Sequence, residues 1–245
     1  MFFLLECGIY KNMTKTEKNK FNINIEEMIQ AGLHIGHRAS RVHPKMKPYL
    51  DGAKSTIHNI NLEKTAEKLE EALNFIQKIV SENKSLILIG TKIQAKNLVK
   101  AFAIEYSLPF INERWIGGTF TNFEIIKKRI NYFKDLEKKK TEGQLEKYTK
   151  KERIKIDREL KNLAIKFEGI KEMERLPDAI FVLDMKEDGL AIKEAKTKGI
   201  KVISICDTNA DPTLADYPIP ANDDAIPAIQ YILEKIKEAI KYGKP

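Results

Sequence analysis

The chain has 245 residues, of which 42% are apolar, enough for one sizeable packed domain with an insertion or for two small domains. Lys and Arg outnumber Asp and Glu by 43 to 35, and this net charge of +8 favours an anionic partner, nucleic acid or a membrane surface, over a lysine-rich protein that has none. The two cysteines, Cys7 and Cys206, are far apart in the sequence, so neither a disulfide framework nor a cysteine-based zinc site is supported. No apolar run approaches the roughly 18 residues that a membrane span needs.

Residues 1–22 start with five apolar-rich positions that lack the basic beginning and the length of a signal peptide. The rest of this segment is polar and rich in lysine. We therefore expect a flexible tail, or a stretch that precedes the true start if translation begins at Met13. After it, Asn24 followed by Glu27 resembles a capping box and predicts a short helix that ends near Gly32.

The next stretch, 34–54, is basic, irregular in pattern and poor in apolar residues. Its basic residues and histidines are His34, His37, Arg38, Arg41, His43, Lys45, Lys47 and Lys54. Such a segment cannot enter a core without leaving many charges unpaired, so we expect it to face solvent or an anion. A metal site at His34 and His37 is a lesser alternative, because no third ligand is evident. Asp51-Gly52 predicts a hairpin turn between 48–50 and 56–58.

From residue 62 onward, helical patterns alternate with short, wholly apolar runs. The predicted helices are 62–80, 92–106, 188–198 and 223–242, and the predicted strands are 86–89, 110–111, 179–183, 202–205 and 217–219. Strands that are apolar on both faces and are separated by helices indicate a parallel sheet covered on both sides. The fold class is therefore α/β, a doubly wound parallel sheet.

One connection in this alternation is too long, because almost seventy residues separate 110–111 from 179–183. Two apolar patterns with the 3-4 spacing of a coiled-coil seam lie in it, one on each side of Gly143. Their apolar positions are Phe123, Ile126, Ile130 and Phe133, then Ile156, Leu160, Leu163, Phe167 and Ile170. We predict an antiparallel helical hairpin. The expected division is a flexible tail 1–22, an α/β domain 23–118 and 175–245, and an inserted coiled-coil hairpin 119–174.

Positive charge is concentrated in this predicted hairpin. Residues 127–161 contain fourteen Lys or Arg and seven Asp or Glu, an excess of seven charges in a chain whose net charge is +8. Outward-reaching Lys and Arg neutralise phosphates without reading base sequence, so RNA contact along the hairpin or its base is favoured over a merely solvated face. The candidate contacts here are Lys127, Lys128, Arg129, Lys150 and Lys151.

The carboxyl ends of the predicted strands, where open α/β sheets bind ligands, carry no complete catalytic motif. Gly90-Thr91-Lys92 lacks a preceding glycine at Walker A spacing, and no GxGxxG follows a strand. Asp184 and Asp207 have the chemistry for a divalent cation, but aspartates at strand ends also cap turns and helices. We expect no enzymatic activity, no cofactor and no small-molecule substrate.

The segment 114–118, Arg-Trp-Ile-Gly-Gly, ends just before the predicted hairpin. Its two glycines suit a sharp turn and a close backbone approach, and backbone N–H groups at a helix start also suit phosphate. Trp115 is favoured as a packing anchor over a base-stacking platform.

Six motifs resemble those of the ribosomal protein S2 family, and they follow the order of that family between about residues 24 and 242. They are AGLHIGH (31–37), NLEKT (61–65), RWIGGTFTN (114–122), LPDA (176–179), DTNADP (207–212) and IPANDDAI (219–226). The resemblance implies a flavodoxin-like five-stranded sheet of order 2-1-3-4-5 with an inserted coiled-coil hairpin. It also implies a structural place on the cytoplasmic small ribosomal subunit, between head and body, bound to rRNA and to neighbouring proteins that include ribosomal protein S1.

The motif positions that the resemblance implies as rRNA or assembly contacts are His34, Arg38, Lys45, Lys47, Lys92, Arg114 and Asn122; Arg41 joins them from the basic stretch. The sequence departs from the family at three places besides the minor changes Ala210 and Ala221, which stand for the usual Ser and Gly. Val42-His43 stands for a usual Trp-Asn, Ile93 for a commonly basic residue, and Pro227 for a usual arginine.

Two other functions stay open from the residues. A flavodoxin-like enzyme would use the strand-end pocket for a nucleotide or flavin, and the purified chain would then carry that ligand. A coiled-coil adaptor would bind proteins only, whereas phosphate anchoring predicts RNA affinity that falls steeply with salt.

Overall fold

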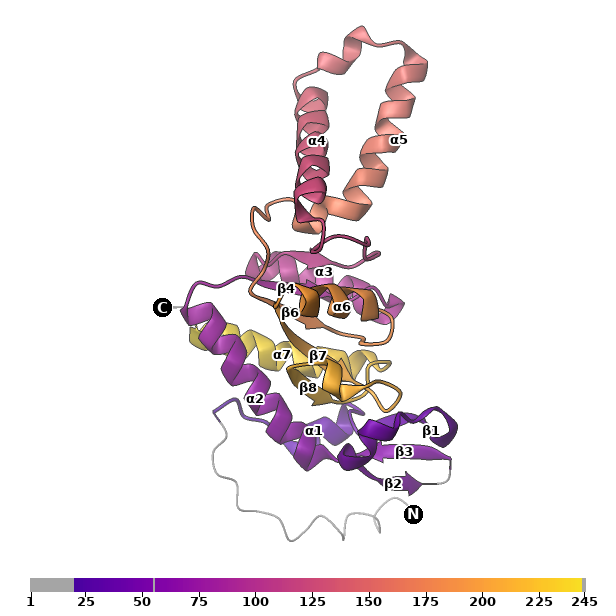
Figure 1. Ribbon diagram of the computed structural model, residues 1–245, viewed down its shortest axis with the longest axis vertical. Helices are drawn as coiled ribbons and strands as arrows, with labels where there is room; N and C mark the ends of the chain where they lie inside the picture. The colour runs from indigo at the N-terminus through magenta and orange to yellow at the C-terminus, as the bar shows by residue number, and fades with distance from the viewer. Residues whose placement is uncertain (1–19, 55, 244–245) are drawn as a thin grey trace.

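The computed structural model describes residues 20–54 and 56–243, and a five-stranded parallel sheet forms its centre (Figure 1). The strands are β4 Leu86–Ile89, β5 Phe110–Ile111, β6 Ala179–Val182, β7 Lys201–Cys206 and β8 Tyr217–Pro220. They lie in the order β5-β4-β6-β7-β8, and every neighbouring pair is parallel. Numbered along the chain within this sheet, the order is 2-1-3-4-5, which confirms the flavodoxin-like arrangement. The prolines of β8 suit an edge strand, where a missing N–H breaks no inner ladder.

Helices cover both faces of the sheet, as the wholly apolar strands predict. The helices packed on the α/β body are α1 Ile25–Gln30, α2 Leu62–Ser81, α3 Ile93–Tyr106, α6 Gly189–Thr197 and α7 Ile226–Gly243. One apolar core lies under α2, α3 and α7, and a second lies under α6. Side chains along β4 alternate between the two: Leu86 and Leu88 enter the first core, and Ile87 and Ile89 the second.

A small antiparallel sheet occupies the basic stretch, which is less irregular than expected. Its strands are β1 Ile35–Arg38, β2 Leu50–Lys54 and β3 Ile57–Ile60, in the order β1-β3-β2, and the short 3-10 helices η2 Ala39–Arg41 and η3 Pro44–Tyr49 lie between β1 and β2. The hairpin is present, but the predicted turn is wrong. Asp51 and Gly52 lie inside β2 at an irregularity of the register, where Gly52 has a φ of 119°. A left-handed glycine suits a bulge as well as a turn.

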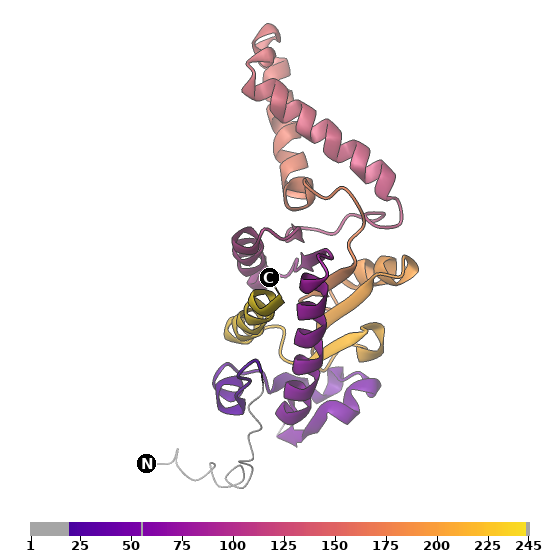
Figure 2. The ribbon, with the colours of Figure 1, turned by 90° about the vertical axis from the view of Figure 1, so that its left-hand side faces the viewer.

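Two long helices are inserted between β5 and β6 and extend away from the sheet (Figures 1 and 2). They are α4 Phe123–Thr141 and α5 Lys150–Phe167. The short 3-10 helix η4 Gln144–Lys147 follows α4, and η5 Glu168–Ile170 follows α5. Their buried apolar side chains include Ile126, Ile130, Phe133 and Leu136 on α4 and Leu160, Leu163 and Phe167 on α5. All seven belong to the second core, so the base of the pair is continuous with the α/β body.

The body begins earlier than expected, because the Phe21 side chain is completely buried in the first core. Of the expected tail 1–22, residues 1–19, which include Cys7, lie outside the described residues. Helix α1 is capped by the Asn24 side chain, which accepts a hydrogen bond from the Glu26 amide at 2.9 Å; this is a simple cap rather than a capping box. Among the described helices, none combines the length and the apolar character that crossing a bilayer requires.

Candidate functional site

The candidate cations of the inserted helices lie in two groups at opposite ends of the pair. Lys127, Lys128 and Arg129 are in the first half of α4, near the sheet, whereas Lys150 and Lys151 form the first turn of α5, near the tip (Figure 1). Lys127 is half-buried, and its Nζ donates to the Glu174 carbonyl oxygen at 3.1 Å. The other four are exposed.

Most of the positive charge on this pair of helices has no acidic partner among the described side chains. Of the fourteen Lys and Arg in 127–161, three form ion pairs there: Lys134 with Glu172, Lys138 with Glu142 and Lys140 with Asp157. The cations are therefore gathered on one protruding element and are largely available to an external anion.

The basic stretch contributes a second group of exposed cations. Arg38, Arg41 and Lys47 are exposed and have no carboxylate partner in the described part of the chain. Lys45 is also exposed, but its Nζ pairs with Asp211 at 2.7 Å and donates to the Thr213 hydroxyl at 2.9 Å. His34 is half-buried, which lowers its pKa and keeps the ring neutral. A neutral imidazole is a weak ligand for phosphate.

The glycine-rich loop before α4 already binds a carboxylate of this chain. Glu194 of α6 is 6% exposed and accepts hydrogen bonds from the Gly118 amide at 2.7 Å and the Phe120 amide at 2.9 Å. It also accepts from the Thr121 amide at 3.2 Å and from the Trp115 indole at 3.1 Å. Burial on its own would raise the pKa of Glu194, but these donors hold it below its usual value. The N–H groups that suit a phosphate are therefore occupied internally.

The flanking residues of this loop have different roles. Trp115 is 8% exposed and packs edge-on against Phe120 with ring centroids 4.8 Å apart, so the packing-anchor interpretation is confirmed. Arg114 is exposed, with no acidic partner among the described residues. Asn122 precedes α4, and its exposed side chain makes no capping hydrogen bond.

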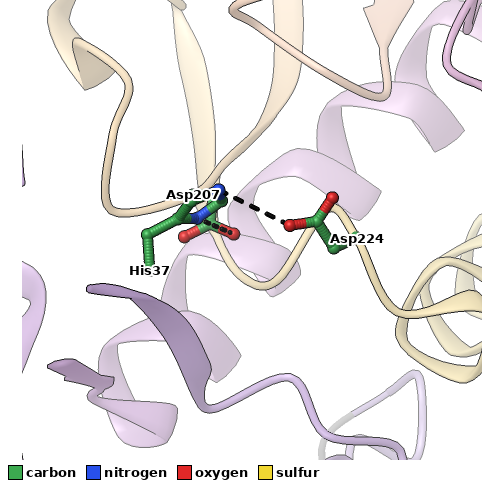
Figure 3. A group of neighbouring side chains, drawn as sticks. All are labelled: His37, Asp207 and Asp224. Atoms are coloured by element: carbon green, nitrogen blue, oxygen red, sulfur yellow. Dashed lines mark ion pairs between the residues drawn. The ribbon is translucent and has the colours of Figure 1, made fainter. Parts of the chain in front are cut away.

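A cluster of charged side chains lies at the carboxyl ends of the parallel strands, where their following loops meet. Lys92, just before α3, is 16% exposed and pairs with Asp184 at 3.0 Å, Asp223 at 2.7 Å and Asp224 at 2.7 Å. The nearby ring of His37 lies between two carboxylates, with Nδ1 at 3.1 Å from Asp207 and Nε2 at 3.5 Å from Asp224 (Figure 3). Lys92 is thus satisfied inside the protein.

Electrostatic crowding in this cluster changes its protonation. Burial, reinforced by the charges of Asp184 and Asp207, raises the pKa of Asp223 to about 7 even though Lys92 opposes the shift. Burial also raises the pKa of the neighbouring Asp188, which accepts from Thr91, to about 6.

His37, Asp207 and Asp224 could together hold a metal ion, since each offers a ligand atom and these atoms lie within 4.8 Å of one another. An imidazole and two carboxylates suit Zn²⁺. No third ligand beside the histidines was evident from the sequence because Asp207 and Asp224 lie 170 and 187 residues after His37. Strand β1 brings His37 to them. Gly36 permits this approach, since a Cβ there would collide with the side chain of Thr208, the residue after Asp207.

Comparisons with known proteins agree with this architecture. Residues 28–243 match the model of the family described as ribosomal protein S2. The chain is also 42% identical over 222 residues to the small ribosomal subunit protein uS2 of Coprothermobacter proteolyticus, a match that covers 91% of this chain and 83% of that protein. The chain belongs to the ribosomal protein S2 family.

Proposed function

We propose that this chain is a structural constituent of the small ribosomal subunit and anchors rRNA through the cations outside its α/β body. The family is structural, so we assign the chain no catalytic activity. The proposed contacts are Arg38, Arg41 and Lys47 on the small-sheet side, Arg114 and Asn122 at the base of α4, and Lys127, Lys128, Arg129, Lys150 and Lys151 on the helix pair. Lys45 contacts rRNA only where a phosphate replaces Asp211 as the partner of its ammonium group. His34 and Lys92 act inside the protein.

The single observation that carries this proposal is the surplus of unpaired positive charge on the inserted helices. An excess of seven charges in 127–161, with three of the fourteen cations ion-paired among the described side chains, makes a cationic rod that extends from the apolar body. Such a rod releases the counterions of a folded RNA without reading its sequence. We propose that α4 and α5 work as a coiled-coil hairpin in this role.

The remaining features of the proposal follow from family membership. We propose a position between the head and the body of the subunit, in the cytoplasm, with neighbouring small-subunit proteins as partners and ribosomal protein S1 among them. Co-sedimentation of the chain with small subunits tests this placement. Recovery of the chain apart from subunits at every salt concentration would contradict it.

Reversing the charge of Lys128 and Arg129 to glutamate is expected to weaken binding to small-subunit rRNA by about tenfold or more at low salt. The slope of log affinity against log salt should become shallower by about one for each lost phosphate contact. Lys127 is left intact because its bond to the Glu174 carbonyl also supports the loop after η5. The measurement is rRNA affinity across a salt titration.

The matched control reverses Lys193 and Lys198, two exposed lysines at α6 on the body, because it changes the net charge by the same amount. Both double variants should unfold within about 0.5 kcal/mol of the parent, since all four side chains are on the surface. Equal affinity losses in the two variants would show that net charge, rather than the helix pair, drives binding.

A further inference from the structure

A hollow lies on the surface of the helix pair, mainly on α4. Binding of phosphates by lysine and arginine does not by itself explain it. Ile125, Lys128, Arg129 and Tyr132 of α4 line it together with Glu159 of α5, and its volume is about 390 Å³. The spacing of the four α4 residues, with steps of three and four, places them in one stripe along the helix. The hollow thus combines an apolar floor with two cations.

Tyr132 gives this hollow an exposed aromatic ring. The side chain is 45% exposed, and its hydroxyl donates to Oε1 of Glu159 at 3.2 Å, which holds the ring between the two helices. Ile125, two turns earlier, is 54% exposed. An exposed ring beside an exposed aliphatic side chain offers a surface on which a nucleobase stacks, a role that the buried Trp115 does not have.

The charges around the hollow favour RNA as the occupant. Lys128 and Arg129 are exposed at its edge and have no carboxylate partner among the described side chains. The positive excess also continues along both helices, over 127–161, which matches a repeating phosphate backbone. A short acidic peptide would need positive charge at the hollow alone.

We propose that the hollow receives an unstacked base of RNA, with the base lying on Tyr132 and the adjoining phosphates on Lys128 and Arg129. This inference rests on the proposed function and adds a base-capture site to it. Single-stranded loops and bulges are where proteins find such bases. The acceptor-only carboxylate of Glu159 disfavours a phosphate at its own corner and favours a base edge that presents N–H donors.

The test compares the full chain and its variants on a short single-stranded RNA and on an oligonucleotide of equal length that has abasic positions. Tyr132→Ala should bind the normal RNA about 5- to 100-fold more weakly, because one base-stacking contact is lost, and should bind the abasic one unchanged. Tyr132→Phe keeps the ring and loses only the hydroxyl bond to Glu159, so it should lose much less affinity for the normal RNA than Tyr132→Ala does. Tyr148→Ala, an exposed tyrosine outside the hollow, is the matched control.

Lys128→Glu with Arg129→Glu should weaken binding of both oligonucleotides, because phosphates are common to them. Base capture is wrong if Tyr132→Ala loses no more affinity for the normal RNA than Tyr148→Ala does, or loses equally on the abasic RNA. It is also wrong if the parent binds rRNA but neither oligonucleotide; that outcome leaves the proposed function standing. Failure of the parent to bind rRNA at low salt would instead remove the proposed function.

Discussion

Replacing Lys92 with methionine is expected to destabilise the protein by about 3 kcal/mol at neutral to alkaline pH, because it leaves three carboxylates without their shared cation. Asp184 and Asp223 are buried, so water does not restore the lost interaction. Methionine keeps the length and apolar stem of lysine, so the change tests the charge rather than the packing. The measurement is the midpoint of urea unfolding, with an unchanged m-value as evidence that the transition is the same.

The effect of Lys92→Met should shrink as the pH falls. Asp223 has a pKa raised to about 7, so in the folded protein it takes up a proton below that pH and the negative charge around residue 92 decreases. In the parent, the raised pKa values of Asp223 and Asp188 mean that the folded state binds more protons than the unfolded one between about pH 4 and 7. These two groups therefore lower stability as the pH rises through that window.

Lys96→Met, four residues further along and inside α3, is the matched control. Lys96 pairs with Glu113 at 2.8 Å on the surface, and such pairs contribute about 1 kcal/mol or less. We expect Lys92→Met to exceed this control clearly at about pH 8 and to approach it at about pH 5.5. Equal losses for both variants at alkaline pH would mean that the strand-end cluster does not depend on its lysine.

The large sheet could be predicted from the sequence because its signal is local. Runs such as 86–89 and 179–182 are apolar on both faces, and only a sheet covered by helices on both sides buries them. The inserted helices were predictable for a similar reason, since the interval between 111 and 179 is too long for a loop and carries helical periodicity. The charge excess along them is also a property of sequence alone.

The small sheet at 35–60 could not be predicted in the same way. Its strands have no clean alternation of polar and apolar residues, and it is held largely by what lies against it. Met46 is completely buried in the second core, and the His37 amide donates to the Thr208 hydroxyl at 2.9 Å. Both contacts involve residues distant in sequence, so no local pattern announces them.

The roles of single charged residues were also beyond local patterns. Lys92 was expected to be an rRNA or assembly contact, whereas the structure pairs it with aspartates that follow two different strands, β6 and β8. Likewise, nothing around 114–121 indicates that a glutamate more than seventy residues away occupies its amides. Carboxylates just after the strands are a weak sequence signal of the partners of Lys92, since a parallel sheet brings the carboxyl ends of its strands together.

Replacing Glu194 with glutamine is expected to destabilise the protein by about 2–4 kcal/mol, because the new side chain is a poor match for the buried donors around it. Oε1 now accepts from the Trp115 indole and the Gly118 amide, and Oε2 from the Phe120 and Thr121 amides. Glutamine has one acceptor oxygen, and its NH₂ group would face one of these pairs of N–H donors. Urea unfolding measures the loss, and Glu187→Gln, at an exposed glutamate just before α6, should change stability by less than about 0.5 kcal/mol.

The pH dependence separates this variant from Lys92→Met. Because the pKa of Glu194 lies below its usual value, its contribution is fully present above the unfolded pKa and is lost only as the pH falls through the folded one. The loss in Glu194→Gln should therefore be constant between about pH 5.5 and 8, where that of Lys92→Met changes. Since the loop held by Glu194 leads directly into α4, Glu194→Gln should also lower the affinity for rRNA. Folded Lys92→Met, measured in buffer without urea, should bind rRNA normally. A Glu194→Gln protein with parental stability would show that the amides of this loop do not depend on the carboxylate of Glu194.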